Sequence, residues 1–175
     1  MPIFARHKLT IEEDCMLPTP KLRLNYSGPN PQKVYPKILE ILKSILKIKP
    51  ENIQEKEYKW DRSAVPEKFS TALEVFKDLD KFTYVLIWID VDGTVKPSKE
   101  FGKEGDVSIV LDGVIRTDYP QDTVWEKSLL YEALRVFWHR IFYQDKRYRF
   151  RGMCRDMMLG LQNAIKEFLN ILPKD

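Results

Sequence analysis

The stretch that decides the fold runs from Ser128 to Leu172 and reads SLLYEALRVFWHRIFYQDKRYRFRGMCRDMMLGLQNAIKEFLNIL. Apolar residues recur three and four positions apart in it, which predicts helix with one buried stripe. The first run of the stripe is Leu130, Leu134, Phe137, Trp138, Ile141 and Phe142, and the second is Phe150, Met153, Cys154, Met157, Met158, Leu161, Ile165, Phe168, Leu169 and Leu172. Polar residues 144–147 separate the runs, so the pattern indicates two helices or one helix bent near residues 145–152, closed by Pro173.

The apolar stripe of the helical region must pack against another apolar surface. The middle of the chain provides this surface, because its apolar residues recur at every second position, as they do on one face of a β-strand. The strongest predicted strand spans residues 82–91, with Val85, Ile87, Ile89 and Val91 on one face and Tyr84, Leu86 and Trp88 on the other. Asp92-Gly93-Thr94 predicts a turn after it. Residues 107–117, which contain Ile109 and Leu111, predict a last strand with a bulge at Gly113.

The remaining elements are shorter. Residues 8–13 and 21–26 alternate like strands, the second of them ending at a Ser27-Gly28-Pro29 turn signal. Asn30 before Pro31 predicts the N-cap of a helix that ends before Pro50. A further strand begins at Ile53. Residues 66–79 fit either a strand or a helix, and the turn signal after them favours the strand.

This order of elements predicts an α+β fold, in which an antiparallel sheet packs against a long C-terminal helical region. We expect a single domain over residues 1–175, with 1–20 as an N-terminal extension or edge strand. The layout of residues 21–172 resembles the helix-grip domains of the lipid-transfer and polyketide-cyclase-like superfamily. That resemblance implies a curved sheet wrapped around the C-terminal helix.

Composition narrows the classes of function. A formal net charge of +3 with 43% hydrophobic and 31% charged residues is typical of an ordinary globular protein, and so small a surplus does not favour nucleic acid. Abundant Lys and Glu with scarce Asn and Gln indicate a thermophilic source. The longest apolar run, 84–89, is far too short to span a membrane, so we expect no membrane partner and a cytoplasmic location. Cys15 and Cys154 lie far apart without a ligand pattern, which predicts reduced thiols, no metal ion and no cofactor.

The sharpest motif is Asp90-Val91-Asp92-Gly93-Thr94 after an apolar strand, which resembles the first motif of the haloacid-dehalogenase-like phosphohydrolases. The resemblance implies Asp90 as the nucleophile, Asp92 as the general acid/base and a Mg²⁺ ion beside the phosphate. That fold needs alternating strands and helices after the motif, and the chain lacks them. We therefore favour a solvated turn here and keep the Mg²⁺-dependent enzyme as an alternative.

A second constellation interleaves basic and aromatic residues between 146 and 155, which suits phosphate contact with base stacking and gives RNA binding as another alternative. We favour a junction whose aromatics enter the core while its arginines form ion pairs. His7 and His139 have no catalytic partners in the sequence, so a packed or surface role is expected for His139.

The leading hypothesis is a non-enzymatic or weakly enzymatic protein that binds an apolar small molecule, or a protein partner, between the sheet and the C-terminal helix. Combining the two periodicities predicts the lining of such a cavity: Ile87, Ile89, Ile109 and Leu111 from the sheet, with Trp138, Phe142 and Met157 from the helices. The opposite face, with Tyr84, Leu86 and Trp88, then needs a cover, which is either the N-terminal segment or a second subunit in a homodimer.

Overall fold

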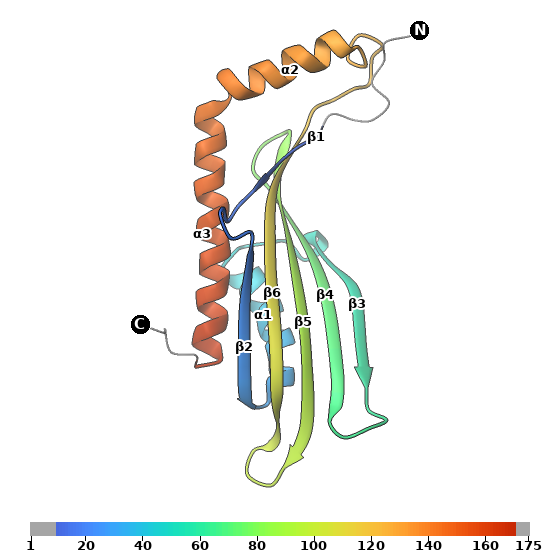
Figure 1. Ribbon diagram of the computed structural model, residues 1–175, viewed down its shortest axis with the longest axis vertical. Helices are drawn as coiled ribbons and strands as arrows, with labels where there is room; N and C mark the ends of the chain where they lie inside the picture. The colour runs from blue at the N-terminus through green and yellow to red at the C-terminus, as the bar shows by residue number, and fades with distance from the viewer. Residues whose placement is uncertain (1–9, 171–175) are drawn as a thin grey trace.

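The computed structural model describes residues 10–170, so His7, the first two residues of the strand predicted at 8–13, Leu172 and Pro173 lie outside the described residues. Within residues 10–170, six strands, three α-helices and two short 3₁₀ helices follow one another (Figure 1). Their order is β1 (Thr10–Asp14), β2 (Lys21–Pro29), η1 (Pro31–Lys33), α1 (Val34–Ser44), η2 (Pro50–Asn52), β3 (Ile53–Asp61), β4 (Glu67–Asp78), β5 (Thr83–Ser98), β6 (Gly102–Asp118), α2 (Leu129–Ile141) and α3 (Gln144–Phe168).

All six strands belong to one antiparallel sheet with the order β1-β6-β5-β4-β3, in which β2 also pairs with β6. β1 and β2 share one edge of the sheet, because β1 pairs with residues 114–118 of β6 and β2 with residues 104–112. The predicted α+β class with an antiparallel sheet and a C-terminal helix is therefore confirmed. The preference for a strand at 66–79 is also confirmed, by β4.

The core lies between the helices and the sheet face that carries the alternate aliphatic residues. Val85, Ile87, Ile89 and Val91 of β5 are fully buried on this face, as the period of two predicted. α3 brings four buried side chains to it, and α1 brings four more. These are Cys154, Met158, Leu161 and Ile165 from α3, with Val34, Ile38, Ile41 and Leu42 from α1.

β5 and β6 are longer than the sequence indicated. β5 continues to Ser98, so Asp92-Gly93-Thr94 lies inside a strand and is not the predicted turn. β6 pairs with β5 in one unbroken register through Gly113, so the predicted bulge there is wrong, and the irregularity of the sheet lies between Glu55 and Glu57 instead. A Cβ atom at Gly113 would lie 2.8 Å from Sδ of Met158. The glycine serves the close approach of α3, and it does not interrupt the strand.

Two further boundaries differ from the prediction. β2 runs through Ser27-Gly28-Pro29, and the chain turns one residue later at Asn30, whose φ of 53° is left-handed. Asn30 precedes the short helix η1 and its side chain makes no cap hydrogen bond. Of the two arrangements predicted for the C-terminal region, two helices is the one observed, but α2 ends at Ile141 and α3 begins at Gln144, so the break lies before the predicted region 145–152. In Figure 1 α3 runs along the sheet while α2 crosses the end of the molecule.

Candidate functional site

The seven residues predicted to line a cavity do not come together. Ile87, Ile89, Ile109 and Leu111 are fully buried in the core, and Met157 packs at its margin. Trp138 lies instead on α2 and Phe142 directly follows the last residue of α2, with 50% and 64% of their surface exposed. The sheet residues therefore pack against α1 and α3, and the two aromatic residues belong to a different surface.

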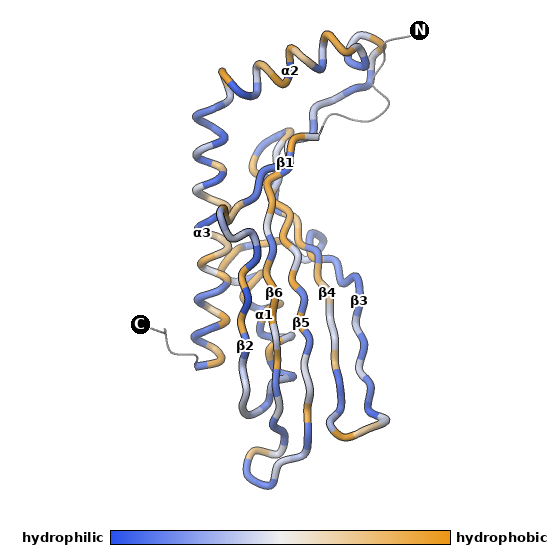
Figure 2. The backbone as a smooth tube through the Cα atoms, viewed as in Figure 1, coloured by the Kyte–Doolittle hydropathy of each residue, from blue (hydrophilic) through white to orange (hydrophobic). Residues whose placement is uncertain are grey.

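That surface is an exposed apolar face on α2, which we call the α2 face. Its six members are each at least half exposed: Leu130, Leu134, Phe137, Trp138, Ile141 and Phe142. They are the stripe that the sequence pattern predicted to be buried, and the structure corrects this prediction. Figure 2 shows apolar residues along α2 where the helix stands clear of the sheet. The rings of Trp138 and Phe142 stack with their centroids 4.7 Å apart.

The side of α2 that faces the molecule is polar and aromatic. His139 is buried, and its Nδ1 shares a hydrogen bond of 2.8 Å with the hydroxyl of Tyr119. The guanidinium of Arg135 lies over the rings of Tyr119 and Tyr131 at 5.2 and 5.0 Å. Ser128 caps the helix by accepting a hydrogen bond from the backbone N–H of Tyr131. The usual arrangement of a surface helix is thus reversed, with the polar side inward and the apolar side in solvent.

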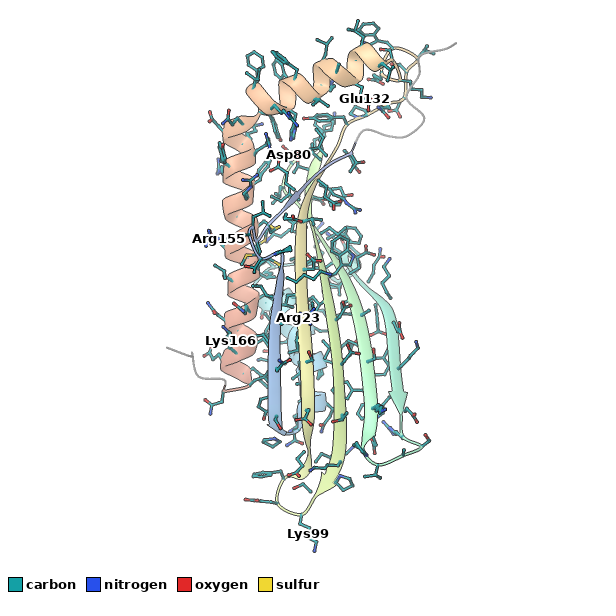
Figure 3. The ribbon with its side chains drawn as sticks, viewed as in Figure 1. Arg23, Asp80, Lys99, Glu132, Arg155 and Lys166 are labelled. Atoms are coloured by element: carbon teal, nitrogen blue, oxygen red, sulfur yellow. A yellow bond between two sulfur atoms is a disulfide. The ribbon has the colours of Figure 1, made fainter. Side chains whose placement is uncertain are left out.

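A second anchor holds the corner between α2 and α3. The hydroxyl of Tyr143 donates to the carboxylate of Asp80, which lies beneath α2 in Figure 3. Burial, together with this hydrogen bond, raises the pKa of Tyr143 to about 12, so the hydroxyl stays protonated and continues to donate. Burial acts to raise the pKa of Asp80, but hydrogen bonds from Tyr143 and from the N–H groups of Phe82 and Thr83 outweigh it and hold that pKa low.

The basic-aromatic segment at 146–155 is divided between the interior and the surface. Arg147 and Arg151 both bind the carboxylate of Glu13 on β1, the second at 2.9 Å, and Phe150 packs against the core. Tyr148 and Arg149 remain exposed, as does Arg155, whose position on α3 is labelled in Figure 3. The expected junction of paired arginines and inward aromatics therefore describes part of this segment.

A disulfide joins the residue directly after β1 to α3, within the 146–155 segment. It links Cys15 to Cys154, whose Cα atoms are 5.5 Å apart, a usual separation for bonded cysteines. The prediction of two reduced, unlinked thiols is corrected here. A separation of 139 residues contains no signal of pairing, because only the folded chain brings these two positions together.

Asp90 and Asp92 lie on the sheet face opposite the helices, in the middle of β5. Both neighbours of β5 run antiparallel to it, so the motif does not stand at the end of a parallel strand as the phosphohydrolase resemblance requires. Partial burial, followed by the charge of Asp92, raises the pKa of Asp90. Among residues 10–170 no group of three or more His, Cys, Asp or Glu side chains is placed to hold a metal ion.

A hollow of about 770 Å³ lies on this helix-free face. The strand register shows that two rows of its lining residues each cross five strands, from β2 to β3. The rows are Asn25, Ser108, Asp92, Ser70 and Lys59, and Ser27, Asp106, Thr94, Lys68 and Asp61. These residues carry hydroxyl, carboxylate and ammonium groups, yet most of the surface that lines the hollow is apolar. Alternation of polar residues on five strands is the signal that could have indicated this hollow.

The sheet face that carries Tyr84, Leu86 and Trp88 was predicted to need a cover. Side chains of the same chain provide part of that cover. Leu86 is fully buried, Tyr84 lies 6.2 Å from the ring of Phe76, and Arg116 lies over Trp88 at 5.7 Å. A partner on this face is therefore not required to shield it from water.

Comparison with known proteins adds little to this description. No protein-family model matches the chain, and no curated protein matches it in sequence. A solved structure of a protein of unknown function from Staphylococcus aureus is similar over 93% of this chain and 98% of its own, with 10% sequence identity and a TM-score of 0.25. Among the described helices, none is long and apolar enough to cross a membrane.

Proposed function

We propose that this protein is a non-enzymatic interaction module that binds the apolar surface of a protein partner through the α2 face. The observation that carries the proposal is the reversed orientation of α2, which exposes six large apolar side chains in one stripe. Contiguous exposed apolar surface of this kind marks interaction sites in folded proteins, whereas single exposed apolar residues are common and carry no such meaning.

The anchoring of α2 supports the proposal because it holds the apolar stripe ready for a partner. The Ser128 cap, the Tyr119–His139 hydrogen bond and the Tyr143–Asp80 hydrogen bond fix the helix at its beginning, near its end and just beyond it. A surface that is already ordered loses less conformational entropy on binding than a flexible one. Trp138 and Phe142 are aromatic residues of the kind that dominate binding energy at interfaces.

This proposal keeps the protein partner of the sequence-based hypothesis and moves its site. The space between the sheet and α3 is filled by buried side chains, so the contact is placed on the outer side of α2. From the helix-grip resemblance we keep only the arrangement of a sheet with a C-terminal helix. A cytoplasmic location is compatible with the disulfide when the source is a hyperthermophile, because intracellular proteins of such organisms do contain disulfides. We therefore propose that the protein is cytoplasmic and comes from a hyperthermophile.

Neither alternative function is retained. The phosphohydrolase needs a parallel strand at Asp90, and β5 is flanked by antiparallel strands. RNA binding through the whole basic-aromatic cluster is weakened, because two of the four arginines in the 146–155 segment are bound to Glu13 and only Arg149 and Arg155 are left exposed.

The proposal is tested with the dye 8-anilinonaphthalene-1-sulfonate, which fluoresces on apolar surface. At high dilution we expect the dye to bind the wild-type chain, and binding to fall markedly in the double variant Phe137→Gln, Ile141→Gln. A matched control is Met153→Gln on the outer side of α3, which is exposed but outside the α2 face. Equal dye binding by wild type and the double variant, with circular dichroism unchanged, would show that α2 offers no apolar binding surface.

A further inference from the structure

We infer that the partner of the α2 face is a second copy of this chain, packed antiparallel against it through the same six residues. The inference rests on the proposed function and names its partner. A symmetric pair of this kind uses one patch twice, so a helix whose own apolar stripe is unsatisfied can cover itself in the second copy.

The charges at the two ends of α2 favour an antiparallel copy over other apolar partners. Two acidic residues and one basic residue lie near the beginning of the helix: Asp122, Glu126 and Lys127. Two basic residues and one acidic residue lie near its end: Arg140, Lys146 and Asp145. Antiparallel packing brings the acidic end of each helix to the basic end of the other. In this arrangement the two helix dipoles also point in opposite directions, which is favourable for neighbouring helices.

The same charges argue against a lipid surface as the partner. Helices that lie on membranes carry basic residues along their polar face and rely on attraction to anionic lipids. The polar side of α2 is instead turned inward, where His139 is buried and Arg135 lies over two tyrosine rings. Its acidic beginning would be repelled by anionic headgroups.

The exposed area of the α2 face is enough for a specific pair. Six large side chains, each at least half exposed, offer on the order of 100 Å² apiece. Two copies would bury about 1,200 Å² together, which reaches the lower end of the range for specific interfaces, roughly 1,200–2,000 Å². Val124 and Trp125, which precede α2 and are also more than half exposed, add to this area.

The position of α2 in the molecule permits the contact. α2 lies across one end of the long axis (Figure 1), and its buried residue His139 is on the side turned away from the α2 face. Two copies can therefore meet end to end without their sheets colliding. An antiparallel pair that uses all six residues is centred near Val136, so Leu134 faces Trp138 of the second copy and Leu130 faces Phe142 of the second copy.

The position of Leu134 close to the two-fold axis gives a sharp test by charge exchange. We expect wild-type chains to dimerise reversibly in sedimentation equilibrium. Leu134→Glu and Leu134→Lys should each weaken dimerisation by about a hundredfold, because like charges then lie about one helical turn apart across the interface. An equimolar mixture of the two variants should restore the dimer. Leu134 is exposed in the single chain, so circular dichroism and Tm of each variant should match wild type at high dilution.

Three results would overturn the inference. A wild-type chain that stays monomeric at every concentration excludes the pair, and a dimer that both charged variants leave intact uses another face. A monomer whose Trp138 emission shifts to the blue on phosphatidylglycerol vesicles, more strongly for Leu134→Lys than for Leu134→Glu, assigns the face to a lipid surface. Each of these can occur while the dye still binds the α2 face, so failure of the pair is distinguishable from failure of the proposed function.

Discussion

α2 and α3 carry the same sequence pattern and end in opposite surroundings. Both have apolar residues three and four apart, yet Cys154, Met158, Leu161 and Ile165 of α3 are buried on the sheet while the α2 face lies in solvent. The difference arises at the corner of Phe142 and Tyr143, where the chain changes direction and carries α2 beyond the end of the sheet. The comparison teaches that helical periodicity identifies an apolar face and does not identify what covers it.

The largest expected effect concerns the covalent link that only α3 has. Replacing both Cys15 and Cys154 with Ser should lower the free energy of unfolding by about 4 kcal/mol, because a long closed loop restricts the unfolded chain. Chemical denaturation of the wild type with and without reductant measures the effect. Reductant should lower the stability of wild type and leave the double variant unchanged. Wild-type stability that does not respond to reductant would mean that the two sulfurs are not joined.

The next effect compares one leucine from each helix. Leu161→Ala should lower the free energy of unfolding by about 3 kcal/mol, because it leaves a cavity in the core. Leu134→Ala should change it by less than about 0.5 kcal/mol at dilutions where the chain is monomeric, because the side chain is already in water. Urea denaturation of the two variants gives both values. Similar losses would break the comparison and show that α2 packs within the single chain.

The smallest effect is a pH dependence confined to α2. Burial, followed by the charge of Arg147, lowers the pKa of His139, and the nearby carboxylate of Glu13 opposes this. The other groups around the ring are Tyr119 and Tyr143. The folded chain thus holds the neutral imidazole. Its contribution to stability is complete above about pH 6.5, the ordinary pKa of histidine, and is lost as the pH falls through the lower folded value.

Amide hydrogen exchange followed residue by residue detects this dependence. Acidification should speed exchange in α2 before it does so in α3, after correction for the intrinsic effect of pH on the exchange rate. His139→Gln should remove the difference in pH response between the two helices. An α2 that is protected equally at neutral and mildly acidic pH would contradict the role assigned to His139 as an anchor.

Much of the fold follows from local pattern. The period of two in β5 and the matching alternation at Ile109 and Leu111 predicted the buried face of the sheet, since alternate side chains of a strand must point the same way. The sequence predicts Trp138 and Phe142 as lining residues of an internal apolar cavity, whereas the structure places both in solvent. The hollow on the helix-free face escaped prediction, because it forms only when five strands align their small and charged residues.

The sequence by itself determined the elements, the α+β class and the existence of two apolar helix stripes, because these depend on residues a few positions apart. Tertiary structure alone decided which stripe is buried, that Cys15 meets Cys154, and that β5 continues through Asp92-Gly93-Thr94. Each of these depends on groups distant in the chain: the sheet under α3, a partner cysteine 139 residues away, and the strands β4 and β6 that hydrogen-bond both edges of β5. Local periodicity does not contain such partners, because they are supplied by the path of the whole chain.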